Sequence, residues 1–252
     1  MKNEITGIKK KTSRFHNQRS AYLFIAPSLI ILTIFVFIPL FGAFAISLMN
    51  IDIYMNDVSL AGPGNYIKMF GDARVGNATF NTLYFALLEV PLQVLLALVL
   101  VMFMTKNTRF HKLLRTTFYL PYVCSMTAIS IMWSMLLNAN YGLVPYLLGR
   151  LGIQVPNLLA SVQWAMPTVI LVTVWKGFGY TLTVLSAAAL GVSNSLYEAA
   201  ELDGANGLQK FLYVTIPGIK STIGFCVVTT LIMSPQVFDQ LYVMTTGGPQ
   251  NS

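Results

Sequence analysis

Long apolar stretches separated by short charged connections dominate the chain. A helix needs about 20 apolar residues to cross a hydrocarbon core of roughly 30 Å, and five stretches are long enough. Two of them carry no formal charge, between Arg19 and Asp52 and between Arg115 and Arg150. The other three carry one charge each: Glu89 within 75–105, Lys176 within 151–197 and Asp239 within 221–252. This pattern predicts an all-α, polytopic membrane protein.

We expect about five transmembrane helices, at residues 21–48, 79–105, 116–138, 163–190 and 221–244. Six prolines fall inside them: Pro27, Pro39, Pro91, Pro121, Pro167 and Pro235. Proline breaks helices in water, but in membrane helices neighbouring groups can satisfy the carbonyls that it frees. We therefore predict kinks rather than breaks. Cys124 and Cys226 also fall within spans and are interpreted as packing residues, not as disulfide or metal ligands.

Composition agrees with this picture, because 55% of the residues are hydrophobic and 10% are charged, against about 25% charged in soluble domains. Basic residues in short loops stay cytoplasmic. Three lie on one side: Lys68, Arg74 and Arg150, with Asp52, Asp57 and Asp72. Twelve lie on the other: Lys2, Lys9, Lys10, Lys11, Arg14, Arg19, Lys106, Arg109, Lys112, Arg115, Lys210 and Lys220.

This asymmetry predicts a cytoplasmic N-terminus. Residues 1–20 then form a basic cytoplasmic segment ahead of an uncleaved first helix, and residues 21–252 form the transmembrane domain. Contact with anionic lipids of the inner leaflet accounts for the net charge of +7 without nucleic-acid binding.

Residues suited to catalysis are scarce. His16 and His111 lie in basic segments without a carboxylate cluster or a Ser/His/Asp spacing, and are interpreted as surface residues. Gly-Lys never occurs in the chain, so there is no phosphate-binding loop of the GxxxxGK[ST] kind. We expect no catalytic residue, no metal site and no cofactor in this chain, and any ATP must be hydrolysed by a partner.

The connection 193–220 predicts two short helices. Ser193 or Ser195 can cap the first, with Glu198 and Glu201 in its first turns near the positive helix end. Gly204 supplies the left-handed residue that ends this helix.

The second helix should begin near Leu208 and stop at Pro217. The apolar residues of the connection exceed what a solvated loop needs: Leu196, Ala199, Ala200, Leu202 and Phe211. This predicts docking against a partner, and packing against the protein's own helix ends is the alternative.

Here the chain resembles binding-protein-dependent ABC importer permeases. Their EAA loop is matched by Glu198-Ala199-Ala200, Asp203-Gly204-Ala205, Phe211 and Val214-Thr215-Ile216-Pro217, with Lys220 where a proline is usual. Further motifs resemble the carbohydrate branch, which includes maltose and glycerol-phosphate permeases: Ala26-Pro27, Phe37-Ile38-Pro39-Leu40, Gly64-Asn65-Tyr66, Asn81-Thr82, 115–121, 175–179 and 245–249.

The resemblance implies a bacterial or archaeal cytoplasmic membrane protein that works by alternating access. It implies a heterodimer with a second permease subunit, two ATPase subunits that bind ATP and Mg, and an extracytoplasmic solute-binding protein. The EAA helices would then seat in a groove of the ATPase. Members of this family have six such spans, so the sixth is expected to be missing from this sequence.

Polar residues within spans are candidates for the solute pathway. They pair along the chain as Glu89 with Gln93, Lys176 with Tyr180, and Gln236 with Asp239. Lys176 could instead snorkel to the membrane interface, or pair with Glu89 or Asp239 as structural glue. Trp133, Trp175 and Tyr180 could stack on sugar rings, although aromatic residues also anchor helices at membrane interfaces.

Two other classes of protein stay open. A proton-coupled secondary transporter also shows rare intramembrane charges, but needs no cytoplasmic docking loop. A polytopic membrane enzyme should bring clustered His, Asp or Glu, which this sequence lacks. Within the favoured interpretation, amino acid, phosphate or polyamine permeases are alternatives to sugar permeases because they share an EAA-type loop.

Overall fold

The computed structural model describes residues 14–52, 58–104 and 108–248. Several predicted features lie outside these residues: Lys2, Lys9, Lys10 and Lys11 of the basic segment, and also Asp57, Lys106 and Pro249. The chain divides into two compact units, Met1–Val75 and Gly76–Ser252.

One long apolar helix makes up most of the first unit. α1 (Arg14–Leu32), the π-helical turn η1 (Thr33–Phe37) and α2 (Ile38–Ser47) follow one another without interruption. Residues Ala21–Ser47 are long and apolar enough to cross a membrane. The first predicted span therefore agrees with the structure to within one residue.

A small hairpin and a short helix follow this span. β1 (Met49–Ile51) pairs antiparallel with β2 (Val58–Leu60), and α3 (Gly64–Gly71) comes next. Asn65 Nδ2 donates to the carbonyls of Ser47 and Met49, each at 3.0 Å, and the Tyr66 hydroxyl lies 2.6 Å from Ser47 Oγ. These bonds tie α3 to the end of α2. The sequence did not predict the hairpin, because three-residue strands carry too little alternation.

The charged pair between α3 and the next helix is exposed. The Asp72 carboxylate accepts hydrogen bonds from the Arg74 guanidinium at 3.1 Å and from the Arg74 backbone N–H at 2.9 Å. Hydrogen bonding to the Arg74 side chain lowers the pKa of Asp72.

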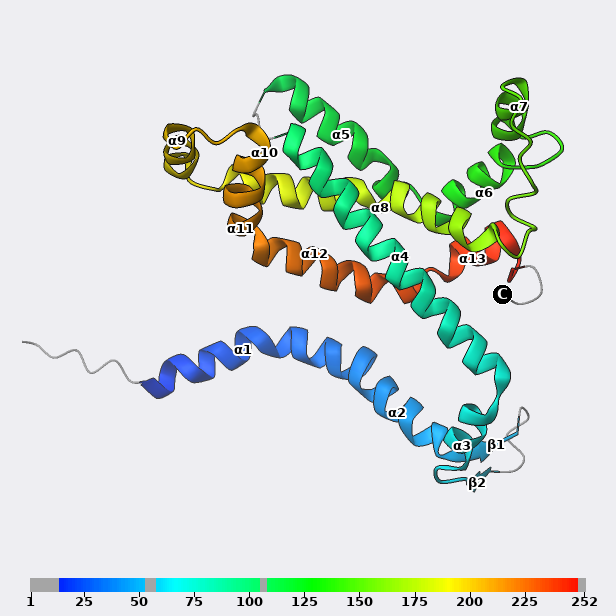
Figure 1. Ribbon diagram of the computed structural model, residues 1–252. Helices are drawn as coiled ribbons and strands as arrows, with labels where there is room; N and C mark the ends of the chain where they lie inside the picture. The colour runs from blue at the N-terminus through cyan, green and yellow to red at the C-terminus, as the bar shows by residue number, and fades with distance from the viewer. Residues whose placement is uncertain (1–13, 53–57, 105–107, 249–252) are drawn as a thin grey trace, which may run out of the picture. The chain divides into compact units, whose positions relative to one another are not determined.

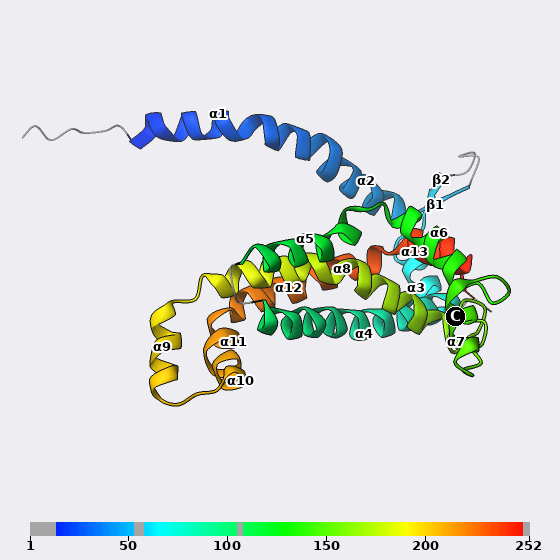
Figure 2. The same cartoon turned by 90° about the horizontal axis from the view of Figure 1, so that it is seen from above.

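The second unit is a helical bundle. Its elements are α4 (Ala73–Phe103, which begins in the first unit), α5 (Arg109–Val123), α6 (Met126–Leu136), α7 (Leu143–Arg150), α8 (Ala165–Leu190), α9 (Asn194–Leu202), α10 (Gly207–Lys210), η2 (Phe211–Thr215), α11 (Ile216–Gly218), α12 (Lys220–Met233), η3 (Ser234–Gln236) and α13 (Phe238–Thr245). Figures 1 and 2 show α4, α5, α8 and α12 side by side, with α9 to α11 at one end and α6, α7 and α13 at the other.

Helix α8 lies at the centre of this bundle. Val169, Leu182 and Leu185 on α8 are fully buried, unlike most apolar residues on the outer faces of the bundle. A Cβ at Gly179 would collide with the carbonyl of Phe118 on α5, so glycine allows these two helices to approach closely. The outward apolar residues are suited to lipid or to partner helices.

The bundle contains two breaks where the sequence predicted continuous helices. α5 and α6 meet at 95° across Cys124 and Ser125, so the third predicted span is sharply bent. The fifth predicted span is interrupted by the 3-10 turn η3, which contains Pro235, and continues as α13. For Pro235 the expectation of a kink rather than a break was wrong, because its turn separates two helices.

The other prolines stay within helices. α4 continues through Pro91, and α8 contains Pro167 in its first turn. Pro39 and Pro217 share a local solution, since a five-residue π-helical turn ends two residues before each. Proline cannot donate a hydrogen bond and its ring collides with the carbonyl four residues earlier. A wider π turn relieves that collision.

By length and composition, three helices in the described part of the chain are able to cross a membrane, or up to five if each bent pair counts as one span. Besides Ala21–Ser47 they are Ala73–Phe103 and Ala165–Leu190. The second bent pair joins Gly207–Gly218 to Lys220–Gln236 at 70°. The predicted polytopic helical fold is therefore confirmed, and the breaks are its main departure from the sequence prediction.

Candidate functional site

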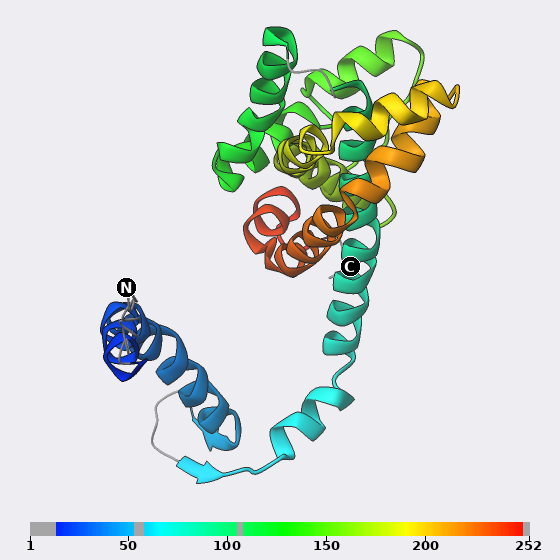
Figure 3. The same ribbon diagram turned by 90° about the vertical axis from the view of Figure 1, so that its left-hand side faces the viewer.

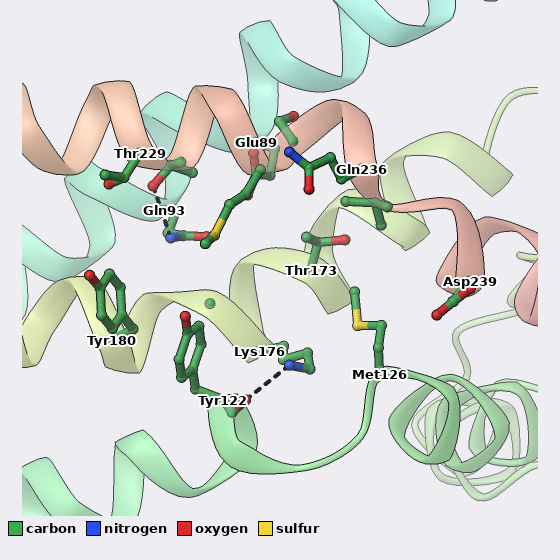
Figure 4. A pocket seen from close by; sticks show the side chains of 15 residues that line it. Glu89, Gln93, Tyr122, Met126, Thr173, Lys176, Tyr180, Thr229, Gln236 and Asp239 are labelled. Carbon is green, nitrogen blue, oxygen red and sulfur yellow. Dashed lines mark hydrogen bonds between the residues drawn. The ribbon is translucent and has the colours of Figure 1, made fainter. Parts of the chain in front are cut away.

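A cavity of about 320 Å³ lies between the helices of the second unit (Figure 4). Its lining comes from α4, from the α5–α6 junction, from α8, and from the stretch that runs from α12 through η3 into α13. Six of the eight residues predicted for the solute pathway line it: Glu89, Gln93, Lys176, Tyr180, Gln236 and Asp239. The structure thus brings together residues that lie up to 150 positions apart in the sequence.

Helical spacing explains how the cavity acquires polar walls. Glu89 and Gln93 are four residues apart and therefore share a face of α4, and Thr173, Lys176 and Tyr180 share a face of α8. Figure 4 shows Glu89, Gln93 and Gln236 on one side of the cavity and Tyr122, Lys176 and Tyr180 on the opposite side.

Lys176 interacts with the end of α5. Its Nζ donates to the Tyr122 carbonyl at 3.1 Å and lies 5.3 Å from the centroid of the Tyr122 ring. That ring stacks on Tyr180 at 4.9 Å. Carbonyls in the last turn of a helix lack an intrahelical donor, and the ammonium group supplies one here. Lys176 forms no ion pair with Glu89 or Asp239, so the alternative of structural glue between charges is not seen.

Gln93, in the cavity wall, connects three helices. Its amide Nε2 donates to Thr181 Oγ1 on α8 at 2.9 Å and lies 3.4 Å from Thr230 Oγ1 on α12. A Cβ at Gly177 would overlap the Gln93 side-chain amide, so this contact requires glycine. Hydrogen bonds between membrane helices contribute about 1 kcal/mol each, and these fix the relative register of α4, α8 and α12.

A second glutamine lies outside the cavity. Gln240 on α13 is fully buried. Its Oε1 accepts from Thr173 Oγ1 at 2.9 Å, and its Nε2 donates to the Val169 carbonyl at 3.2 Å. It therefore has a structural role, holding α13 against α8.

Two buried groups in the cavity wall differ from these glutamines. Glu89 and Ser234 are each only 3% exposed. Glu89 Oε2 and Ser234 Oγ have no hydrogen-bond partner in the described part of the chain. Ser234 lies beside the Glu89 carboxyl group without a well-formed hydrogen bond to it. Buried polar atoms are nearly always paired in folded proteins, so a ligand in the cavity could complete the hydrogen bonding of both groups.

The two predicted tryptophans are not among the lining residues. Trp133 and Trp175 contact each other edge to face, with centroids 5.4 Å apart, and pack against an apolar cluster that includes Val169, Val172 and Met244. Their bulk fills the bundle interior.

Sequence reasoning missed several lining residues: Tyr122, Met126, Thr173, Gly177, Thr229, Thr230, Met233, Ser234 and Val237. Thr173 and Gly177 could have been predicted from the sequence, because they lie three residues before and one residue after Lys176. At the two helix breaks only Gln236 was predicted, and Tyr122, Met126, Ser234 and Val237 gave no signal without knowledge of the breaks.

The segment 193–220 forms the predicted pair of short helices, at the end of the bundle (Figure 3). α9 ends in a Schellman motif. Gly204 has φ +77°, its N–H donates to the Glu201 carbonyl at 3.0 Å, and the Ala205 N–H donates to the Ala200 carbonyl at 2.9 Å. The left-handed role predicted for Gly204 is therefore confirmed.

The second helix begins one residue earlier than expected. α10 starts at Gly207 behind a capping box, in which Asn206 Oδ1 accepts from the Gln209 N–H and Gln209 Oε1 accepts from the Asn206 N–H. The helix continues through Pro217 and ends at Gly218. Pro217 therefore lies in the last turn, and the bend comes after it.

Three details of the first helix differ from the prediction. Ser193 precedes α9, but its hydroxyl bonds Ser195 Oγ at 2.8 Å and does not cap a backbone N–H. Glu198 lies in the middle of α9, not in its first turn. Glu201 lies in the last turn, where its carboxylate pairs with Lys210 Nζ at 3.0 Å. The helix-dipole argument for these acids was wrong.

The EAA-like residues differ in exposure. Glu198, Ala199, Asp203, Gly204 and Pro217 are exposed, while Ala200 and Ala205 are half-buried. Leu202 is 90% exposed, whereas Phe211 is buried in the core of the bundle. Phe211 and Ile219 therefore anchor the segment to its own bundle, while the apolar side chains of Leu196 and Leu202 are exposed.

A 460 Å³ groove separates α9 from the rest of the bundle. It is bridged by the Glu201–Lys210 pair and by a 2.8 Å hydrogen bond between the Tyr197 hydroxyl and Thr215 Oγ1. Within residues 14–52, 58–104 and 108–248, no three His, Cys, Asp or Glu side chains lie close enough to hold a metal ion.

No protein-family model matches the chain. It is 32% identical over 237 residues to the probable ABC transporter permease protein YurN of Bacillus subtilis, covering 92% of this chain and 81% of YurN. It is 32% identical over 238 residues to the lactose transport system permease protein LacF of Rhizobium radiobacter, covering 92% and 79%.

A solved structure shares the fold. The chain superposes with a TM-score of 0.76 and 25% identity on a chain of the bacterial alginate ABC transporter in complex with an alginate pentasaccharide-bound periplasmic protein, covering 92% of this chain and 78% of that one. Identity above 30% over nearly the whole chain, together with this fold, decides the family. The chain belongs to the ABC transporter permeases.

Proposed function

We propose that this permease imports a sugar or sugar derivative, and that the solute passes through the cavity between α4, α8 and α12. The observation that carries the proposal is the lining itself. Stacked Tyr122 and Tyr180 rings face a wall of hydroxyl, amide and carboxyl groups. Sugars present apolar ring faces and many hydroxyls, which aromatic rings and such polar groups bind together.

Energy for transport would come from partner subunits. In this proposal the exposed surface of segment 193–220, with Glu198 and Leu202, docks on an ATPase that binds ATP and Mg. A second permease would complete the membrane path, and a solute-binding protein would deliver the sugar from outside. The N-terminus would then be cytoplasmic, in the cytoplasmic membrane of a bacterium or archaeon.

Two observations support this arrangement. The relatives include a lactose permease, and the matched structure holds a saccharide-loaded periplasmic protein. Furthermore, segment 193–220 is held in the apolar core by Phe211 and Ile219, whereas most residues of α9 are exposed. Alternating access then amounts to transmission of ATPase closure through η2 and α11 into α12.

The test is uptake in vesicles that contain the complete complex with its own partner subunits and binding protein. The probes are radiolabelled lactose, maltose, trehalose and sn-glycerol 3-phosphate, with glutamine, inorganic phosphate and spermidine for the non-sugar alternatives. We expect ATP-dependent accumulation of at least one sugar or sugar phosphate. Uptake that does not depend on ATP and stops when a proton uncoupler is added would instead indicate a secondary transporter.

A further inference from the structure

The strongest unexplained feature of the cavity is a buried carboxyl group without a partner. Glu89 on α4 is 97% buried, and its Oε2 accepts no hydrogen bond from the described residues. Ser234 Oγ, equally buried, lies beside this carboxyl group in the wall of the same cavity, without a well-formed hydrogen bond to it. Neighbouring Gln93 has its donors engaged by Thr181 and Thr230, so it leaves Glu89 unpaired.

We propose that Glu89 is a specificity-determining residue that accepts a hydrogen bond from a hydroxyl group of a neutral saccharide, with Ser234 binding a second oxygen of the same solute. This rests on the proposed function and deepens it. Hydrogen bonds to a charged or strongly polar acceptor are stronger than those between neutral groups, and a site left with an unpaired acceptor discriminates against solutes that lack the hydroxyl.

The charged groups around the cavity disfavour an anionic solute. Glu89 and Asp239 both line it and would repel an anion. Among the described residues that line it, Lys176 is the only lysine or arginine, and its ammonium group already contacts the Tyr122 carbonyl and ring. The remaining polar lining consists of hydroxyls and amides, which match a polyhydroxylated ring.

The volume of the cavity limits the size of the solute that it can hold. About 320 Å³ lies at the lower end of the range for small-molecule sites. This is room for one or two sugar rings and not for a longer oligosaccharide held entirely within this chain. The stacked tyrosines then contact a ring face while Glu89 and Ser234 hold its edge.

The experiment compares a transported sugar with its monodeoxy analogues in vesicles holding the complete complex. The binding protein is kept saturated with each probe, so that recognition by that protein does not limit uptake. Wild type should carry the parent sugar at least about tenfold faster than the analogue that lacks the bonded hydroxyl, the factor expected for one hydrogen bond to a charged group. Glu89→Leu should reduce this ratio to near one, and Glu89→Gln, which keeps an acceptor, should retain part of it.

The matched control is Gln240→Leu, which removes a buried polar group outside the cavity. It should lower uptake of the parent sugar and the analogues equally, and so keep the wild-type ratio. A second measurement covers variants that assemble poorly. Glu89→Cys, with Cys124 and Cys226 replaced by serine, should be alkylated by N-ethylmaleimide more slowly when the transported sugar is present.

The outcomes separate this inference from the proposed function. If wild type carries a sugar but Glu89→Leu keeps the hydroxyl preference, or the sugar does not protect Glu89→Cys, Glu89 is not a solute-binding residue. If wild type carries spermidine or phosphate and no sugar, the proposed function itself fails and the saccharide assignment fails with it.

Discussion

Gly204 offers the sharpest test of the coupling role. Its φ of +77° is one that residues with a Cβ rarely adopt, and no atom lies within 4 Å of the position that a Cβ would take. Gly204→Val therefore introduces backbone strain without a collision. A β-branched residue in this conformation costs about 1 to 3 kcal/mol, and alanine about 1 to 2 kcal/mol.

This strain acts on the two hydrogen bonds that end α9. Both carbonyls, of Ala200 and Glu201, accept only because Gly204 turns the chain back. A loss of 1 to 3 kcal/mol is comparable to the contribution of these bonds, so the angle between α9 and α10 should change. No membrane helix is touched.

The assay is solute-stimulated ATP hydrolysis and uptake by the complete complex in vesicles, with membrane insertion measured separately. Gly204→Val should insert normally and lose most of both activities, and Gly204→Ala should be milder. The control is Gly207→Val in the same segment, because Gly207 has no positive φ and open space around its Cβ position. Near wild-type activity of Gly204→Val would refute the docking role of this segment.

Two further predictions concern packing and topology. Gly179→Ala should destabilise the assembled bundle by about 1 to 3 kcal/mol, because the added Cβ meets the Phe118 carbonyl. Gly224→Ala should be neutral, because no atom lies near its Cβ position. Thermal unfolding of the detergent-solubilised complex measures both effects. With the two native cysteines replaced by serine, a membrane-impermeant maleimide should label Leu202→Cys only from the inside and Tyr141→Cys only from the outside; the reverse pattern would overturn the orientation.

The polar residues of the cavity were predictable because charges are costly inside a membrane and therefore carry information. Glu89 and Lys176 stood out in apolar sequence, and helical spacing brought Gln93 and Tyr180 onto the same faces. The tryptophans were not predictable in this way. An aromatic ring suits a sugar, a lipid interface and a bundle core equally well, and only packing decides among them.

Helix ends in segment 193–220 were predictable where one residue dictates the backbone. Gly204 is such a case, because its conformation excludes other residues. The roles of Glu198 and Glu201 depended on where α9 begins, and a shift of a few residues moved both away from the positive end. The burial of Phe211 depended on the packing of the whole bundle against that segment.

Proline alone could not predict the breaks. Pro91 and Pro121 each remove one backbone donor, yet α4 continues while α5 ends two residues after Pro121. The difference lies in what surrounds the freed backbone. After Pro121 the chain extends at Cys124, with φ −67° and ψ 148°, and Lys176 from α8 satisfies the Tyr122 carbonyl.

Both helix breaks fall at the cavity, and this coincidence has a physical cause. Irregular backbone is tolerated at membrane depth only where protein or a polar cavity satisfies it. The α5–α6 break contributes Tyr122 and Met126 to the lining, and the α12–α13 break contributes Ser234, Gln236 and Val237. The continuous helices α4 and α8 supply other polar side chains of the lining, among them Glu89 and Lys176. The two interrupted helices add further polar groups, such as Ser234 and Gln236, to the cavity that we propose as the solute pathway.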